Sequence, residues 1–188
     1  VQSMARTGKA KFTADDWLLP AIEAMARGGV RAVNVESLAK QIGASKGSFY
    51  WFFANREALV TAALARWLEV GTDRVAAAVA DLSDPAAKLR ALAEVAFAGG
   101  PGRGIEIALQ ADVDSPEVRR VLAEAHRRRL AILRGLFVQA GRVEEAAERA
   151  ALSMYATYLG FLQLRRADPD SVPDGADRDR FLDSLGLS

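Results

Sequence analysis

Apolar residues recur at every third or fourth position along most of the chain, which predicts a series of amphipathic helices. The first predicted helix begins near Thr13, a candidate N-cap, and its pattern ends at Gly28. Pro20 lies inside this helix, and because an interior proline removes one backbone hydrogen bond, we expect the helix to bend there.

Two short helices joined by a tight turn are predicted next. Asn34 is a candidate N-cap for a helix that stops at Gly43, and Ser45 is a candidate N-cap for a second helix over 46–52. Two helices joined by a glycine-containing turn of three or four residues are typical of a helix-turn-helix unit, whose second helix enters the major groove of DNA. The pattern therefore predicts double-stranded DNA as a partner.

Longer helical patterns fill the rest of the chain. Asn55 is a candidate N-cap for a long helix over 56–81, and further helices are predicted over 85–97, 105–111, 116–140 and 143–166 and near the C-terminus. The predicted fold is all-α, with an N-terminal three-helix helix-turn-helix domain joined by the long helix to a C-terminal helical domain. We expect a flexible arm over 1–11, a DNA-binding domain over 12–58 and an effector-binding and dimerisation domain over 59–188; residues 1–3, before Met4, resemble a cloning remnant.

The run from Ile42 to Phe53, followed by Asn55-Arg56-Glu57 and Leu59, resembles the DNA-binding segment of the TetR family of bacterial transcription regulators. The resemblance covers about residues 12 to 66 and is only architectural beyond them. It implies that base-reading positions are occupied by Lys46, Gly47 and Tyr50. It also implies positions close to the DNA phosphates for Ser45, Ser48, Trp51 and Arg56.

The residue types support some of these roles and leave others open. Lys46 is long and cationic, so it can reach a guanine edge or a phosphate, and Tyr50, one turn later, can contact a phosphate or a thymine methyl group. Ser45 would serve as a helix cap even in a protein that never binds DNA. The aromatic spacing of Phe49 and Phe53 is more typical of a core than of DNA contacts.

The net charge of +1 conceals an asymmetry along the chain. Residues 1–60 contain eight Lys and Arg against five Asp and Glu, an excess that suits phosphate binding. Arg6, Lys9 and Lys11 belong to the predicted arm. They either form a disordered tail or contact phosphates or the minor groove.

Several classes of function find no support in the sequence. With no cysteine and one histidine, one chain cannot build a thiolate or two-histidine metal site, and there is no Gly-x-Ser-x-Gly nucleophile motif. We therefore expect no cofactor, no metal and no enzymatic activity; an all-α enzyme with a vestigial DNA-binding domain is the alternative. The glycines over 99–104 lack the Gly-Lys-Ser/Thr of a phosphate loop and are interpreted as a connector beside the ligand chamber.

No apolar run approaches the roughly 18 residues that span a bilayer, and no signal-peptide core is present. We therefore expect a cytoplasmic, nucleoid-associated protein without a membrane partner. Asp112, Asp114 and Glu117 lack the spacing of a calcium loop and are interpreted as turn and cap residues.

The resemblance further implies a homodimeric repressor that binds a palindromic operator and is released by a small apolar or amphipathic effector. Helical period suggests pocket walls at Trp67, Phe97, Leu109, His126, Leu133, Met154, Tyr155 and Tyr158. Each of these residues can instead be core, and His126 can lie on a solvated helix face.

The predicted helix over 143–166 is apolar on nearly two faces and so requires two partners. Pairing with a second copy of the chain, as a four-helix bundle, would satisfy this pattern. The candidate interface consists of Leu152, Ala156, Leu159, Gly160, Gln163, Phe181, Leu182 and Leu185. A C-terminal half that only dimerises or binds a protein, without a ligand, fits the sequence equally well.

Overall fold

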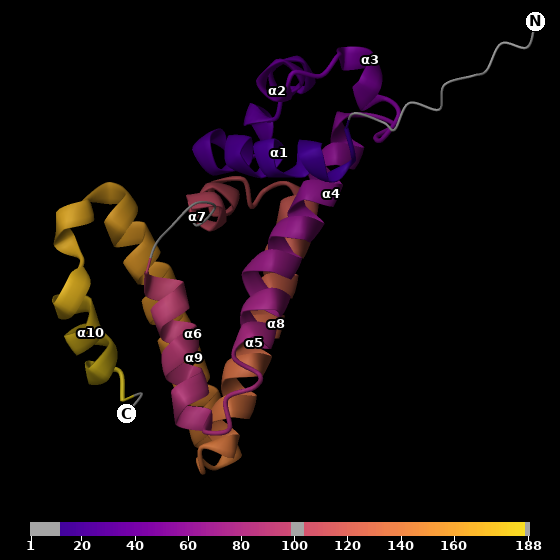
Figure 1. Cartoon of the computed structure of the whole chain (residues 1–188). Helices are drawn as coiled ribbons and strands as arrows, with labels where there is room; N and C mark the ends of the chain where they lie inside the picture. The colour runs from indigo at the N-terminus through magenta and orange to yellow at the C-terminus, as the bar shows by residue number, and fades with distance from the viewer. Residues whose placement is uncertain (1–11, 99–103, 187–188) are drawn as a thin grey trace, which may run out of the picture.

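The structure is a computed structural model that describes residues 12–98 and 104–186. Within these ranges every regular element is a helix, which confirms the predicted all-α fold. The three N-terminal helices lie at one end of the molecule, and the longer helices run away from them (Figure 1). The predicted arm and most of the glycine run over 99–104 lie outside the described residues.

The N-terminal domain consists of α1 (Asp15–Gly28), a 3-10 turn η1 (Val30–Ala32), α2 (Val35–Ile42) and α3 (Lys46–Phe49). Two predicted caps are confirmed: Asn34 Oδ1 accepts a hydrogen bond from Ser37 N at 2.9 Å, and Ser45 Oγ accepts one from Ser48 N at 3.1 Å. Gly43 ends α2 with φ of 71°, a conformation that favours glycine. These local signals set the turn that positions α3.

Two details of the N-terminal half differ from prediction. Thr13 donates its backbone N–H and its hydroxyl to Asp16 Oδ2, at 2.7 and 2.9 Å, instead of accepting as a cap. A carboxylate accepts both bonds at once, and they lower the pKa of Asp16. The recognition helix α3 ends at Phe49, three residues earlier than predicted, and continues as a turn.

The connecting helix, predicted over 56–81, is helical from Arg56 to Ala78 but is not α-helical throughout. It begins at the Asn55 cap as α4 (Arg56–Leu68), passes through a π-helical turn η2 (Glu69–Asp73) and ends as α5 (Arg74–Ala78). Gly71 lies in the centre of the π-helical turn. Periodicity alone could not reveal this turn, because the contacts made there come from a distant helix.

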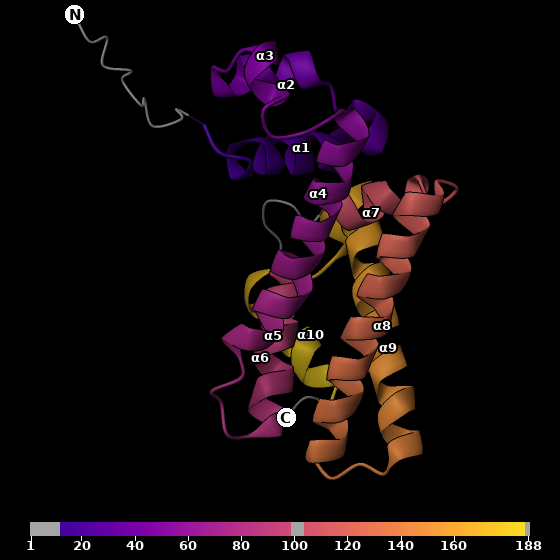
Figure 2. The ribbon, with the colours of Figure 1, turned by 90° about the vertical axis from the view of Figure 1, so that its right-hand side faces the viewer.

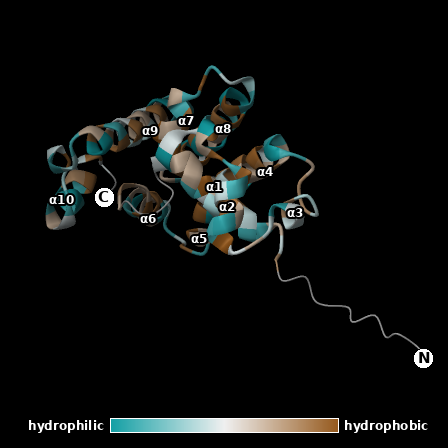
Figure 3. Ribbon diagram, turned by 90° about the horizontal axis from the view of Figure 1, so that it is seen from above, coloured by the Kyte–Doolittle hydropathy of each residue, from teal (hydrophilic) through white to brown (hydrophobic). Residues whose placement is uncertain are grey.

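The C-terminal helices are α6 (Pro85–Phe97), α7 (Gly104–Ala111), α8 (Pro116–Gln139), α9 (Glu144–Ala167) and α10 (Gly175–Ser184), with a 3-10 turn η3 (Pro169–Ser171) before α10. α8 and α9 lie side by side over most of their length, α4 contacts α8, and α5 lies beside α6 (Figures 1 and 2). Seen from above, α8 and α9 carry both hydrophilic and hydrophobic stretches (Figure 3). Within the described ranges, none of the helices is long and apolar enough to cross a membrane.

The core of the N-terminal domain extends into the C-terminal half. Trp17 and Phe49 pack edge to face with ring centroids 5.3 Å apart. The same cluster includes five residues of α7 and α8: Ile105, Leu109, Val118, Leu122 and Ala125. The core of the N-terminal domain therefore includes residues of the predicted C-terminal domain, and the boundary predicted between residues 58 and 59 stays a prediction.

α10 packs on its own chain, which corrects one residue of the predicted dimer interface. Leu182 is 0% exposed within the second core cluster, between helices of the same chain. The Phe181 ring lies 5.7 Å from that of Phe97 and 6.0 Å from that of Phe161. Leu182 therefore cannot contribute surface to a partner while α10 is docked in this way.

Asp112, which directly follows α7, contacts the N-terminal domain. Its Oδ2 accepts a hydrogen bond from Val30 N at 2.7 Å. Gly29 precedes Val30 with φ of 68°, and a Cβ at Gly29 would lie 2.0 Å from Asp112 Oδ2. Only glycine permits this close contact, so Asp112 is more than the turn residue that the sequence suggested.

We expect Gly29→Ala to destabilise the fold by about 1–3 kcal/mol, because it combines a left-handed backbone with a steric conflict at Asp112. The free energy of unfolding, from urea denaturation followed by circular dichroism, measures this loss. Gly135→Ala on α8 is the matched control, since a Cβ there meets no atom of the described residues within 4 Å. Equal stability of the two variants would show that the Gly29 contact is unimportant.

Candidate DNA interface and ligand pocket

The recognition helix presents several predicted DNA-contacting residues to solvent. Tyr50 is 56% exposed and Trp51 is 80% exposed, at the point where α3 becomes a turn. Phe49, between Ser48 and Tyr50, is fully buried, and the Tyr50 ring packs against it with centroids 5.1 Å apart. The two exposed rings lie side by side in sequence, and the DNA contacts predicted for Tyr50 and Trp51 stay predictions.

Lys46, at the start of α3, is also exposed and is paired with Glu36 of α2. Its Nζ lies 2.6 Å from Glu36 Oε1, and the hydrogen bond, together with the opposite charge, raises the pKa of Lys46 and lowers that of Glu36. Such an exposed pair is weak, so Lys46 can leave it to contact DNA.

The other small residues of the recognition helix are engaged locally. Ser45 Oγ accepts the capping bond from Ser48 N, and Ser48 Oγ donates to Ser45 O at 2.7 Å. Gly47 is exposed between them. Their predicted contacts with DNA remain predictions, because local hydrogen bonds explain both serines.

Arg56 has a role inside the domain that the sequence did not suggest. Its Nε donates to Val33 O at 2.8 Å, and its Nη2 donates to Val30 O. These bonds join the start of α4 to the segment between α1 and α2. The phosphate contact predicted for Arg56 stays a prediction and would compete with them.

A pocket of about 620 Å³ lies between α1 and the helices of the C-terminal half. It is lined by Leu18, Leu19 and Ile22 of α1 together with residues of the connecting helix and of α6 to α9. Six of the eight predicted wall residues line this pocket: Trp67, Phe97, Leu133, Met154, Tyr155 and Tyr158. Their contact with a ligand stays a prediction.

Two predicted wall residues lie elsewhere. Leu109 is fully buried in the core shared with α1, because the apolar face of α7 points toward the DNA-binding domain. His126 lies beside a separate hollow with Gln110 and Arg119, and its ring packs edge to face on Tyr155 at 5.6 Å. Helical period alone placed both residues on the wrong side of their helices.

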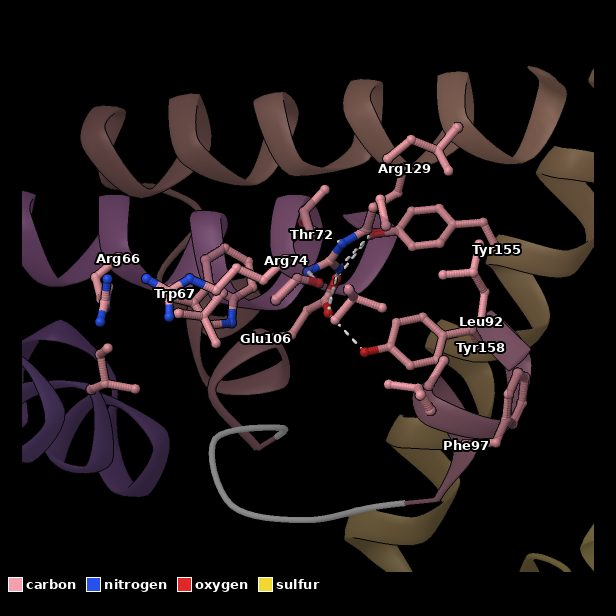
Figure 4. Close-up of a pocket in the computed structure, with 18 of the residues that line it drawn as sticks. Arg66, Trp67, Thr72, Arg74, Leu92, Phe97, Glu106, Arg129, Tyr155 and Tyr158 are labelled. Carbon is pink, nitrogen blue, oxygen red and sulfur yellow. Dashed lines mark hydrogen bonds and ion pairs between the residues drawn. The ribbon is translucent and has the colours of Figure 1, made fainter. Parts of the chain in front are cut away.

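A buried carboxylate lies in the pocket wall (Figure 4). Glu106 of α7 is 2% exposed, and both of its oxygens lie 2.8 Å from Arg129 Nη1 of α8. The Tyr155 hydroxyl donates to Glu106 Oε1 at 2.9 Å, and the Tyr158 hydroxyl donates to Oε2 at 3.1 Å. We call these four residues the Glu106 network; a buried ion pair needs such additional bonds to offset its desolvation.

Two groups of the network keep fixed protonation states. Burial disfavours the charge on Arg129, but the negative charge of Glu106, the two tyrosines and the hydrogen bond to Glu106 together outweigh burial and raise the pKa of Arg129. Burial and the charge of Glu106 raise the pKa of Tyr155. Arg129 is therefore cationic and Tyr155 neutral across the physiological range.

Sequence reasoning missed Glu106 and Arg129. Arg129 directly follows Arg127 and Arg128, and a run of arginines is typical of a solvated helix face, although only Arg129 of the three lines the pocket. The available signal was Glu106 itself. It is a lone acidic residue in the apolar stretch 105–109, and a buried acid requires a buried partner.

Residues 19–63 match the family model described as bacterial regulatory proteins, tetR family. This segment gives the chain the DNA-binding domain of the TetR family. The match agrees with the resemblance of the helix-turn-helix segment to transcriptional regulators of that family. None of the curated proteins matches the sequence.

Several solved structures share the fold, and the first is described as a transcriptional regulator of the TetR family. A regulator from Agrobacterium tumefaciens is 19% identical with a TM-score of 0.73, over 91% of this chain and 96% of its own. FadR from Bacillus subtilis, in complex with stearoyl-CoA, is 18% identical with a TM-score of 0.66, over 92% and 95%. AibR, in complex with isovaleryl coenzyme A and operator DNA, is 20% identical with a TM-score of 0.65, over 93% and 96%.

His126, the only histidine of the chain, gives a pH prediction. Burial lowers its pKa from 6.5, against the charge of Glu106, so the unfolded chain binds the proton more readily. The contribution of neutral His126 to the free energy of unfolding is therefore fully present above about pH 6.5. It is lost as the pH falls through the lower pKa of the folded state. We expect the free energy of unfolding to fall more between pH 7 and 5 in the wild type than in His126→Gln. Parallel curves would show that His126 contributes nothing.

Proposed function

We propose that the protein is a TetR-family repressor that binds a palindromic operator as a homodimer and is released by a small apolar or amphipathic effector. The observation that carries the proposal is the pocket between α1 and the C-terminal helices. A ligand in it would contact both the DNA-binding domain and the helices that hold that domain. Ligand binding can thus favour one arrangement of the DNA-binding domains over another.

The chemistry of the lining supports an effector with an apolar body. Most of the wall is aliphatic or aromatic. Its polar groups are the Glu106 network, Thr72, the arginines Arg66 and Arg74, and the carboxylates of Asp15 and Glu23 on α1. Arg66 and Trp67 lie on one side of the network, with Leu92 and Phe97 on the other (Figure 4). The complexes of AibR and FadR with coenzyme A thioesters agree with an amphipathic ligand.

The exposed face of α9 supports dimerisation. Leu152 is 59% exposed, and Ala156, Gly160 and Gln163 are exposed at following turns of the same helix. Leu159 is partly buried in the second core cluster and borders this stripe. A stripe of apolar and small residues allows close packing against the same stripe of a second copy. Phe181 and Leu185 are partly covered by their own chain and would lie at its margin.

Selection of random duplex DNA on the purified protein tests the proposal. We expect the wild type to enrich a palindrome with half-sites about one helical turn, roughly 34 Å, apart. The Lys46→Ala, Tyr50→Ala double variant should lose this enrichment while keeping helicity and dimerisation, because both side chains are exposed. Wild-type enrichment of sequences without two-fold symmetry would contradict a homodimer on a palindrome.

Thermal unfolding tests the effector. Isovaleryl-CoA and stearoyl-CoA serve as probes, with free coenzyme A as the control. Saturation at 100 times the dissociation constant adds about 2.7 kcal/mol to stability, so an acyl thioester that binds should raise the melting temperature when free coenzyme A does not. No shift with either thioester, together with no organic molecule extracted from purified protein, would favour a C-terminal half without a ligand.

A further inference from the structure

We infer that Arg129 is the residue through which occupancy of the pocket acts on the connecting helix. The Glu106 network holds the Arg129 guanidinium against the π-helical turn η2, and a ligand that replaces the network contacts releases it. The inference rests on the proposed function and names the regulation of the same site. It assigns Arg129 a positioning role and does not require it to contact DNA.

The guanidinium of Arg129 has two sets of partners. Its Nη1 binds Glu106, while its Nε donates to Thr72 Oγ1 at 3.0 Å and its Nη2 to Gly71 O at 3.4 Å. Thr72 is buried, and the guanidinium lies 5.4 Å above the Trp67 ring. Because the guanidinium is rigid and planar, it cannot turn away from Glu106 without disturbing its bonds to η2.

Arg129 lies against the backbone of η2 at Gly71. A Cβ at Gly71 would lie 3.4 Å from Arg129 Nη2, which is ordinary van der Waals contact, so the guanidinium is packed directly on this turn. Arg128, the residue before Arg129 in α8, binds the last residue of η2: its Nη1 lies 2.9 Å from Asp73 Oδ2. Two neighbouring arginines of α8 thus hold three successive residues of η2.

A π-helical turn is rare and contains one more residue per hydrogen-bonded ring than an α-helical turn. Its conversion to α-helix would change the register between α4 and α5 by one residue, about 1.5 Å of rise and about 100° of rotation. α4 begins at Arg56, which is bound to Val30 O and Val33 O of the DNA-binding domain. A change of register at η2 is thereby transmitted to the orientation of that domain.

The burial of Glu106 and Arg129 limits which ligands can release η2. Removing Arg129 from Glu106 without a substitute would leave a buried charge unpaired, which is strongly unfavourable. An effector must therefore carry a polar group that reaches the Glu106 network, and a purely apolar ligand would fill the pocket and leave Arg129 in place. In this proposal, the state that binds the operator is the one without a ligand, in which Arg129 is paired with Glu106.

The test compares variants that release η2 without leaving a charge unpaired. Thr72→Val removes only the Oγ1 acceptor, and the neutral pair Glu106→Gln, Arg129→Gln removes the ionic connection. Arg127→Gln is the control, since Arg127 lies on the same helix and pairs with Glu124 at the surface. Two quantities are measured: hydrogen exchange of the amides of residues 69–75 and affinity for the selected operator.

We expect faster exchange over residues 69–75 and an operator affinity about 5- to 100-fold weaker in Thr72→Val and in the neutral pair. Arg127→Gln should match the wild type in both quantities. Thr72→Ser keeps the acceptor oxygen and should restore most of the slow exchange. If Thr72→Val acted only by disturbing the packing around residue 72, Thr72→Ser, which also loses a methyl group, would not restore the slow exchange.

Unchanged exchange, or unchanged or stronger operator binding, in folded and dimeric Thr72→Val would overturn the inference. If the neutral pair fails to fold, Thr72→Val alone decides. If the wild type selects no palindrome, the proposed function fails separately, and exchange over residues 69–75 still decides whether Arg129 holds the π-helical turn.

Discussion

The ion pair between Glu106 and Arg129 is the interaction on which the arrangement of the C-terminal half depends. It joins α7 to α8, receives two hydroxyl groups from α9 and extends to the connecting helix through Gly71 and Thr72. Four elements that are distant in sequence therefore meet at one buried carboxylate. Because Glu106 is buried, a poorly paired charge there would destabilise the fold, so the positions of its partners are tightly constrained.

Polar contacts at residues 30–33 join the DNA-binding domain to the C-terminal helices and to the start of α4. Asp112 accepts from Val30 N, and Arg56 donates to Val30 O and Val33 O. The apolar core that the domain shares with α7 and α8 reinforces these bonds. If α4 and α7 move relative to each other, the position of the recognition helix α3 must therefore change.

Local signals in the sequence predicted the local structure well. Asn34, Ser45 and Asn55 cap the helices that their spacing indicated, because a cap depends only on residues within one turn. The Glu106 network and the π-helical turn could not be predicted in the same way, since both arise from contacts between residues 23 to 58 positions apart. Periodicity identified apolar faces but not which neighbour each face meets, and Leu109 and Leu182 were therefore misplaced.

The α1 wall of the pocket has a consequence for chimeric regulators. Exchanging the helix-turn-helix segment together with α1 for that of another protein would also replace Leu18, Leu19 and Ile22, and with them part of the pocket wall. If the pocket holds the proposed effector, the residues that select the ligand and those that read the operator are encoded in overlapping stretches of this chain. A hybrid designed to change only the operator would then have to keep these α1 residues.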